Sequence, residues 1–458
     1  MGPAISATNG RRRCAAMFSR RLVWLHIGAA QSVDASNLNR NQETQVLPTV
    51  QVFRKPAGDI AFILLLGLMA SLPGFGVDMA LPALANTAAA LDVPTHSAGL
   101  TISSYMISFG IAPLIFGPVS DRYGRKPVVT FGCIIFVLAS VGCALAPSLA
   151  LLITYRILQG IGAAAMTLAI VIARDSFDDS VVREKISYIV MAIYVSPIAA
   201  PIAGAALLAL GGWRCIYAVL AALGVTLLIG VCLGFDEDPR RGTADRLSVL
   251  ALVRDYGRVL SHPVARAYMA AAAASFGVVA AYATGSSLFF IQIVGMSPDR
   301  YAIIFGLTAL ASIGGAFFDS RLSARRISPL YPLSIGLMIV VSASSALLAM
   351  ALIGWMPVPV AVSLFATITF SGGMIAPGIT QGALQQMPQM AGTVSAASNC
   401  LAMTAGSLSS AFAAVLFDGR TALSMAGIMT LCSFLALISF WTASRHVARH
   451  AVMQSREA

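Results

Sequence analysis

The chain has 458 residues, of which 58% are hydrophobic and only 11% are charged, and its mean hydropathy is +0.82. Soluble globular proteins are closer to a quarter charged. A composition this apolar excludes a single water-soluble core and indicates the lipid bilayer as the solvent of the folded chain. The net charge of +11 would suggest a nucleic-acid ligand in a soluble protein. Here the placement of the cations, described below, explains the charge, and we expect no nucleic-acid partner.

The cysteines and histidines give no sign of a metal site or a cofactor. The seven cysteines are scattered, mostly within apolar segments, and form no C-x-x-C pair, so we expect them to pack as small hydrophobic side chains. The five histidines lie outside the predicted membrane spans. We therefore expect no cofactor, no metal and no histidine relay within the membrane.

Residues 1–57 differ in character from the rest of the chain. They are polar, carry several arginines and have no sustained apolar period. The stretch RRRCAAMFSRRLVWLHIGAA resembles a signal peptide, but its apolar part is short and is interrupted by His26. We expect these residues to form a disordered cytoplasmic tail, or to lie upstream of the true start of the protein.

From about residue 60, apolar stretches of roughly twenty residues alternate with short polar breaks, as the thickness of a bilayer requires. This pattern predicts an all-α integral membrane protein with twelve transmembrane helices in two six-helix bundles. The predicted spans are 60–85, 98–119, 127–146, 149–173, 186–210, 213–234, 264–292, 300–318, 329–353, 356–378, 391–416 and 421–443.

A polar linker separates the sixth predicted span from the seventh. Its residues Leu247–Leu260 have an amphipathic pattern, which predicts a helix that lies on the membrane surface or against the bundles. The predicted organisation is tail, first bundle, linker, second bundle and a short cytoplasmic tail, at residues 1–57, 58–235, 236–263, 264–445 and 446–458.

The lysines and arginines predict the orientation in the membrane. All of them except Arg156, Arg214, Arg300 and Arg420 fall on the side that holds both termini and the linker. Because cytoplasmic loops carry the excess of Lys and Arg, we expect both termini and the linker to be cytoplasmic. The same placement accounts for the net positive charge.

The two predicted bundles show a weak internal repeat. The second span ends in GPVSDRYGRKP, and the eighth ends in FFDSRLSARRISP. The same type of charged loop therefore occurs at the same place in each half. Related halves are typical of transporters, in which one half rocks against the other to give alternating access.

Four motifs resemble those of a known family. GPVSDRYGRKP is similar to the signature loop of the major facilitator superfamily, and RILQGIGAAA in the fourth span is similar to the motif of its drug–proton antiporters. SPIAAPIAG followed by GWRCIY, and VDMALPAL in the first span, resemble the bicyclomycin- and chloramphenicol-resistance branch. The resemblance covers about residues 58–445 and implies the twelve-helix major facilitator fold.

The charged loop GPVSDRYGRKP contains a carboxylate that needs a stabilising partner. We expect Gly117 to permit close helix packing, and we expect Asp121 at the cytoplasmic end of the second helix, where the backbone dipole is negative. A carboxylate there needs a cation or the N-terminus of another helix. The simpler alternative is a loop that only fixes topology, but orientation needs only the cations and leaves Asp121 unexplained.

The resemblance implies that this loop is part of a cytoplasmic latch. In the family, this aspartate meets the N-terminal end of the eleventh helix, here near Gly392, and the arginine pairs with a carboxylate after the fourth helix. The set would hold the two halves shut, and inward opening would break it. The predicted latch residues are Gly117, Asp121, Arg122, Arg125 and Asp175.

Asp78 and Arg156 are predicted to carry the proton chemistry. Asp78 is the only carboxylate well inside a predicted span, and burial of such a group favours its neutral form. Arg156 stays protonated, so it can lower the proton affinity of the acid in one conformation and release it in another. Gln159 lies one turn further and can share hydrogen bonds with Arg156. The alternatives are a structural carboxylate near the periplasmic rim and an arginine that only joins neighbouring helices.

The fifth span contains a predicted hinge at Pro197, Pro201 and Gly204. Proline removes a backbone hydrogen bond and lets a helix bend, and we expect Gly204 to pack against the eighth helix. The resemblance implies a hinge and seal of the central cavity in exporters. A plain proline kink is the alternative.

Aromatic and methionine side chains provide candidates for a substrate cavity. Such side chains can line an adaptable apolar cavity, although most helical aromatic residues pack in cores or face lipid. The candidates are Tyr105, Tyr194, Tyr282, Phe289, Phe370 and Met374.

The function that these observations favour is proton-coupled efflux of small, mostly apolar drugs or toxic compounds by alternating access. An exporter of a specific metabolite, such as a purine, sugar or amino-acid derivative, is the main alternative. A membrane enzyme is disfavoured because no His cluster, Ser–His pair or phosphate loop is present in the sequence. An inactive homologue or sensor is disfavoured by the intact Asp78 and Arg156. We expect a monomer in the bacterial inner membrane whose partners are substrate, protons and lipid.

Overall fold

The computed structural model describes residues 53–54, 58–234, 236–237, 249–325 and 328–457. Most of the predicted tail 1–57 and the middle of the predicted linker lie outside the described residues. Within the described residues the chain is almost entirely helical, as the apolar pattern predicts.

The first half of the chain supplies six spans from broken and unbroken helices. Its elements are α2 (Gly58–Asp78), the 3-10 helix η1 (Leu81–Ala83), α3 (Leu84–Ala90), α4 (Thr95–Ala98), α5 (Leu100–Ile111), α6 (Pro113–Tyr123), α7 (Arg125–Leu145), α8 (Leu149–Ala164), the 3-10 helix η2 (Ala165–Leu168), α9 (Ala169–Ser176) and α10 (Asp179–Gly234).

The second half supplies six more spans after the linker helix. Its elements are α11 (Val249–Ser261), α12 (Pro263–Ser287), the π-helix η4 (Leu288–Ile293), α13 (Pro298–Ala324), α14 (Leu330–Ile353), α15 (Val358–Gln385), the 3-10 helix η5 (Pro388–Met390), α16 (Ala391–Val415) and α17 (Leu423–Glu457).

Two features explain why length and hydropathy alone identify only nine or ten of these spans among the described residues. Helix α10 has 56 residues and is broken at Gly211 and Gly212, whose backbone is not helical, so it contains two spans. Helix α16 is rich in small and hydroxyl residues and packs between α5 and α12. With α10 divided and α16 included, the predicted twelve spans in two bundles are confirmed.

The second span is bent rather than straight. The segments Thr95–Ile111 and Pro113–Tyr123 meet at an angle of 40°. Pro113 lacks a backbone N–H and its ring displaces the preceding turn, which accounts for the bend. A two-residue antiparallel pair, β1 (Phe53–Arg54) with β2 (Asp236–Glu237), is the one strand contact among the described residues.

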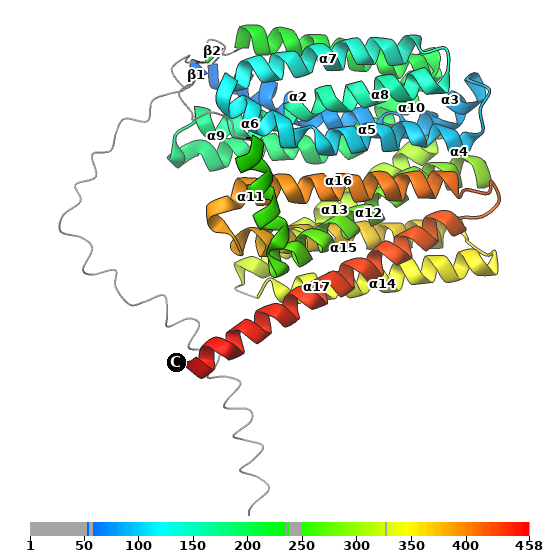
Figure 1. The fold of residues 1–458 in the computed structure, drawn as a ribbon. Coiled ribbons are helices and arrows are strands. Elements are labelled where there is room, and N and C mark those ends of the chain that lie inside the picture. Colours follow the sequence, from blue (N-terminus) through cyan, green and yellow to red (C-terminus); the bar gives the residue numbers. More distant parts are fainter. Residues whose placement is uncertain (1–52, 55–57, 235, 238–248, 326–327, 458) are drawn as a thin grey trace, which may run out of the picture. The chain divides into compact units, whose positions relative to one another are not determined.

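Helix α11 lies where the amphipathic pattern predicts a helix. It packs against α12 and α16, and Val259 on its apolar face is fully buried. Arg254 and Arg258 are exposed. Figure 1 shows α11 at the same end of the helices as α6, α9 and the end of α17. We call this end of the molecule the linker end.

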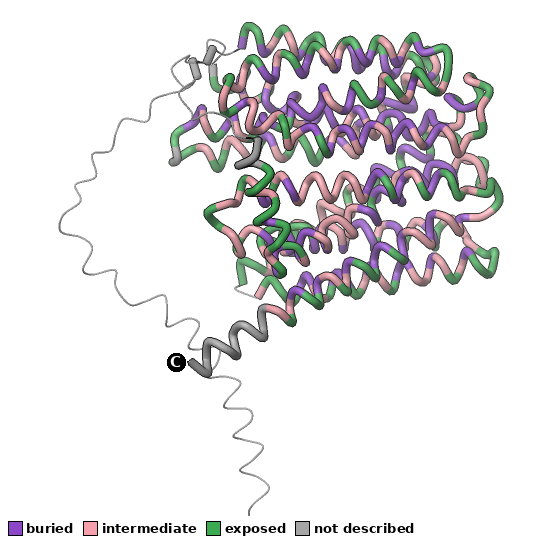
Figure 2. Tube along the Cα trace, in the orientation of Figure 1, coloured by how far each residue is buried: buried purple, intermediate pink, exposed green. Residues whose placement is uncertain are grey.

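Each half has its own buried core, and apolar side chains also cover the outside. One core cluster comes mainly from the first six spans and the other mainly from the last six. Figure 2 shows buried segments on the inner faces of the helices and exposed segments on the outer faces. Large apolar residues such as Leu138, Leu210 and Ile353 are exposed. Exposed apolar surface of this extent fits a protein surrounded by lipid.

Hydroxyl groups join the two halves at the end opposite the linker. The Ser103 hydroxyl donates to the Ser410 hydroxyl at 3.0 Å, and Ser410 also contacts the Thr284 hydroxyl at 2.7 Å. The hydroxyl of Ser407 donates to the Ser103 carbonyl at 2.8 Å, and that of Ser287 donates to the Leu81 carbonyl at 2.6 Å. We call this set the hydroxyl seal. It closes the contact between α5, η1, α12 and α16 with no charged side chain among its members.

The break in α10 gives a prediction about stability. Gly212 has φ +72° and ψ −176°, a region that essentially only glycine occupies. The variant Gly212→Ala should lower the free energy of unfolding by about 1–3 kcal/mol, because its Cβ strains this turn. Thermal unfolding of the purified protein in detergent would measure the loss.

The matched control is Gly427→Ala in α17, where a Cβ meets no atom within 4 Å and the backbone is helical. This control should be neutral or slightly stabilising, since alanine favours helix more than glycine does. Equal losses in the two variants would contradict the strain at Gly212.

Candidate functional site

The guanidinium of Arg156 is the most deeply buried charge among the described residues. The side chain projects from α8 and is completely shielded from solvent. Its Nε donates to the Thr101 carbonyl at 3.1 Å, and its Nη1 donates to the Gly76 carbonyl at 2.8 Å and to Gln159 Oε1 at 2.7 Å. These bonds tie α8 to α5 and to the end of α2.

The end of α2 makes the Gly76 carbonyl available. In a continuing helix this oxygen would accept from the backbone N–H of Ala80, but Ala80 bonds to the Val77 carbonyl instead. Helix α2 stops at Asp78, before the short 3-10 turn of η1. The break in the first span therefore supplies an oxygen that solvates the arginine.

Aromatic rings and a second polar chain complete the surroundings of Arg156. Its guanidinium carbon lies 4.4 Å from the centre of the Tyr105 ring and 5.7 Å from that of Tyr217. Gln159 in turn donates to the Ser140 hydroxyl at 2.8 Å, which reaches α7. The Nη2 atom of Arg156 has no hydrogen-bond partner among the described residues. One side of a buried cation is thus left without an acceptor.

Asp78 lies at the end of the same broken helix, two residues after Gly76. Its side chain is half-buried, and no hydrogen bond or ion pair joins it to a described residue. The structure thus brings Arg156 and Gln159 into direct contact, and leaves Asp78 nearby but unpaired with Arg156.

The predicted latch residues form a cluster at the linker end. Arg125 pairs with Asp121 at 2.5 Å and with Asp175 at 3.5 Å, and it donates to the Ser120 hydroxyl at 2.5 Å. Gly124, at φ 98°, allows the turn between α6 and α7 that brings these groups together.

The two ion pairs described for this cluster, Arg125–Asp121 and Arg125–Asp175, both lie within the first half. The Arg125–Asp175 pair therefore joins α7 to α9 and does not itself hold the two halves together. The Asp121 side chain is 62% exposed, and no contact joins it to Gly392 of α16, around which a Cβ would find open space. Arg122 lies over the Tyr123 ring at 5.5 Å. The prediction that Gly117 permits close helix packing is wrong for this conformation, because a Cβ built there meets nothing within 4 Å.

The predicted hinge lies in α10, but one of its contacts differs from the prediction. Pro197 and Pro201 are both inside the helix. A Cβ at Gly204 would collide with the backbone of Met79, so Gly204 packs against the first span. The prediction that it packs against the eighth span is wrong. Helix α10 contacts α13 through Ile198, whose side chain lies 3.7 Å from a Cβ built on Gly306.

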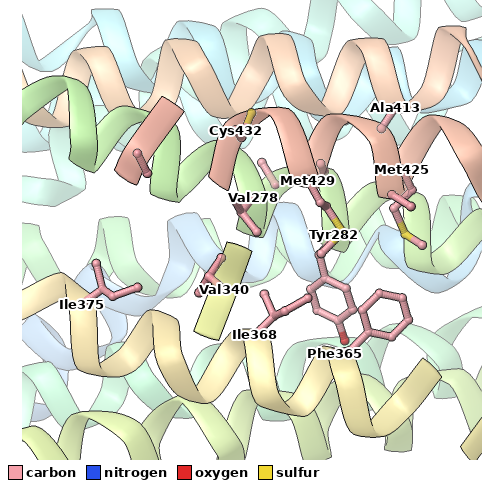
Figure 3. Close-up of a cluster of buried hydrophobic side chains, with 14 of the residues drawn as sticks. Val278, Tyr282, Val340, Phe365, Ile368, Ile375, Ala413, Met425, Met429 and Cys432 are labelled. Carbon is pink, nitrogen blue, oxygen red and sulfur yellow. The ribbon is translucent and has the colours of Figure 1, made fainter. Parts of the chain in front are cut away.

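A cavity of about 560 Å³ lies between α10, α12, α13, α15 and α16. It reaches along the helices toward Leu384 and Val394, near the linker end. Its wall includes the Tyr282 and Phe305 rings, which stack with their centres 5.5 Å apart. Phe365, outside the lining, lies 4.9 Å from the Tyr282 ring. Figure 3 shows Tyr282 and Phe365 in contact between two helices of the second half.

Two of the six predicted cavity residues line this space, namely Tyr194 and Tyr282. The other four lie outside it. Tyr105 is buried against Arg156 and donates to the Pro73 carbonyl at 3.0 Å. Phe289 packs on Phe290, Phe370 lies against Phe318, and Met374 is buried in the second half.

Sequence reasoning missed several residues that the structure places in these sites. Tyr217 and Ser140 belong to the surroundings of Arg156, and Asn399 and Ser275 line the cavity. The available signal was a polar side chain in an apolar span, which singles out Asn399 best. Serines are too common in these helices to be singled out in the same way.

These features together define a class of protein. Twelve spans in two similar halves, a cavity between spans of both halves and a buried charge within the first half are the architecture of a membrane transporter. Residues 66–411 match the sequence profile of the Major Facilitator Superfamily. The chain belongs to this superfamily, as the motifs predict.

Individual relatives agree with this membership. A bicyclomycin resistance protein homolog of Haemophilus influenzae is 27% identical over 384 residues, which cover 83% of this chain and 95% of the relative. Multidrug resistance protein D of Escherichia coli is 28% identical over 387 residues, with 83% and 95% covered. A crystal structure of a bacterial homolog of the human lysosomal transporter Spinster has the same fold, with a TM-score of 0.68, 16% identity and coverage of 86% and 97%.

The polar chain around Arg156 gives a second prediction about stability. The variant Gln159→Leu should lower the free energy of unfolding by about 1.5–3 kcal/mol, because it removes a hydrogen bond to a buried charge. Thermal unfolding in detergent would detect this. The control Gln385→Leu, at the exposed end of α15, should change stability by less than about 0.5 kcal/mol. A Gln159 variant as stable as this control would show that Arg156 does not need its partner.

Proposed function

We propose that the chain exports small, mostly apolar drugs or toxic compounds across the bacterial inner membrane in exchange for protons. The observation that carries this proposal is that two charged groups near the break in the first span, Arg156 and Asp78, are not paired with each other. Arg156 Nη2 lacks an acceptor and Asp78 lacks a donor among the described residues, and the same fold contains a cavity of about 560 Å³, which is large enough for a drug. The names of the relatives, which refer to bicyclomycin and multidrug resistance, support the same substrate class.

The proposed coupling depends on a change of partner at Asp78. In the conformation described here, Asp78 is free to hold a proton because no cation is paired with it. When the halves move, a rearrangement of the first span at its break after Asp78 would bring the carboxylate to the free Nη2 of Arg156, and the resulting ion pair favours release of the proton. Arg156 stays charged throughout, so only Asp78 gains and loses the proton.

The proposed sidedness follows from the placement of Lys and Arg, which assigns the linker end to the cytoplasm. The cavity reaches toward that end, whereas the hydroxyl seal joins the halves at the other end. On this assignment the described conformation is inward-facing. Outward opening would break the seal and bring the linker ends of α6 and α16 together.

The latch has a matching role in this cycle. Asp121 is exposed here, and closure of the linker end would place it at the N-terminus of α16, where unpaired backbone N–H groups favour an anion. Arg125 and Asp175 would hold α6, α7 and α9 in position to make that contact. We further propose that the transporter acts as a monomer, with the proton gradient as its energy source and no cofactor.

The coupling role of Asp78 can be tested by neutralising it. In inside-out vesicles, Asp78→Asn should reduce substrate-dependent proton flux to background and abolish uphill export, since the site can no longer release a proton. The control Asp299→Asn, an exposed carboxylate in the first turn of α13, should retain both. Proton-coupled export that survives Asp78→Asn would refute this coupling. A narrow profile of exported compounds would instead favour a metabolite exporter.

The latch is tested by removing its central cation. Arg125→Ala should slow export severalfold without preventing folding, because Asp121 and Asp175 lose their shared partner. Arg445→Ala is the control, since Arg445 contacts only the Trp441 ring among the interactions described for it. Export assays would be combined with labelling of cysteines introduced at the linker end. Export at the wild-type rate, with unchanged labelling, would rule out a latch.

A further inference from the structure

The composition of the cavity wall limits what the cavity can bind. Among its described lining residues there is no Asp, Glu, Lys, Arg or His. A cation that entered would lose water without gaining a counter-charge, which carries a large desolvation cost. The wall thus disfavours charged ligands, even though the chain places a carboxylate at Asp78, outside the lining.

The wall nevertheless contains hydrogen-bonding groups without partners. Asn399 of α16 is the only side-chain amide among the described lining residues, and no hydrogen bond from a described residue reaches it. Its amide offers two donors and one acceptor. Ser395 lies one turn before it on the same face of α16. On the other side, the Ser275 hydroxyl of α12 is buried and has no partner among the described residues.

The remaining part of the wall suits an apolar ring. The Tyr282 and Phe305 rings are stacked with an interplanar angle of 2°, and the Tyr282 hydroxyl is already satisfied by Thr308 at 2.5 Å. Phe276 and Val279 of α12 also line the cavity. Flat aromatic walls bind ring systems by stacking and by burial of apolar surface.

The proton site is separated from this cavity. Asp78 is the last residue of α2 and is absent from the cavity lining, whose first-half residues all belong to α10. A substrate in the cavity therefore does not contact the carboxylate that would carry the proton.

We propose that this cavity selects uncharged amphiphiles that carry an aromatic ring and a hydroxyl or amide group, and that Asn399 is the residue that determines this specificity. The ring stacks in the aromatic part of the wall, while the polar group bonds to Asn399 and to the hydroxyls beside it. This inference rests on the proposed function and goes beyond it by naming the substrate class. It also implies that substrate and proton do not compete for one carboxylate.

Direct binding to the purified full chain in detergent tests this inference without requiring transport. The probes are chloramphenicol, which is uncharged and carries a ring, hydroxyls and an amide, and tetraphenylphosphonium, a permanent cation with rings alone. Equilibrium dialysis should find that the wild-type chain binds chloramphenicol at least about tenfold more tightly than the cation. Asn399→Leu should weaken chloramphenicol binding about tenfold, as expected for one or two lost hydrogen bonds.

A charge introduced at the same position should reverse the selectivity. Asn399→Asp should tighten binding of tetraphenylphosphonium at least about tenfold, because it places a counter-charge in the cavity. The matched control is Gln381→Glu, which adds the same charge on the exposed side of α15, outside the lining, and should change neither affinity. Gel filtration would verify that each variant is folded.

Three results would overturn the inference. They are equal or tighter binding of the cation to the wild-type chain, no binding of either probe, and unchanged chloramphenicol binding by a folded Asn399→Leu. If Asn399→Leu does not fold, Asn399→Asp still decides, since unchanged cation binding refutes the role of this position. Loss of proton coupling in vesicles with normal chloramphenicol binding would contradict the proposed antiport alone.

Discussion

A guanidinium can lie inside an apolar bundle only if oxygens and rings replace the water that it has lost. In the first half, Arg156 meets this demand with the Gly76 and Thr101 carbonyls, Gln159 and the Tyr105 ring. The first span must break after Gly76 for its carbonyl to be free, and this break leaves the following carboxylate at the end of a helix. The position of the acid is thus a consequence of how the arginine is solvated.

The two halves contribute different features to the molecule. The fully buried Arg156 belongs to the first half, whereas the cavity is lined mainly by the second half and contains no Asp, Glu, Lys, Arg or His among its described residues. The hydroxyl seal between them consists of neutral groups, which can separate and meet water at a small net cost, because each lost hydrogen bond is replaced by one to water. A proton and a substrate that bind at separate places can influence each other only through the relative position of the halves.

The sequence predicts the spans well because bilayer thickness imposes a length, and it predicts the contact of Arg156 with Gln159 because residues three apart on a helix are neighbours. It does not predict which face of an apolar helix lines a cavity, since both faces are apolar in a membrane. Tyr105 and Met374 were therefore assigned to the cavity but are buried elsewhere, and Asn399 was missed. Contacts between distant spans, such as that of Gly204 with the first span, are equally invisible in a single sequence.

The central claim is that the protonation state of Asp78 determines the relative position of the two halves. Pulsed electron paramagnetic resonance can measure this directly, with spin labels at the exposed positions of Tyr123 and Gln389 at the linker end, in a background without the seven native cysteines. The account predicts that the distance distribution shifts with pH in the otherwise wild-type chain, and that Asp78→Asn gives one distribution at every pH. A shift with pH that persists unchanged in the Asp78→Asn variant would contradict the account.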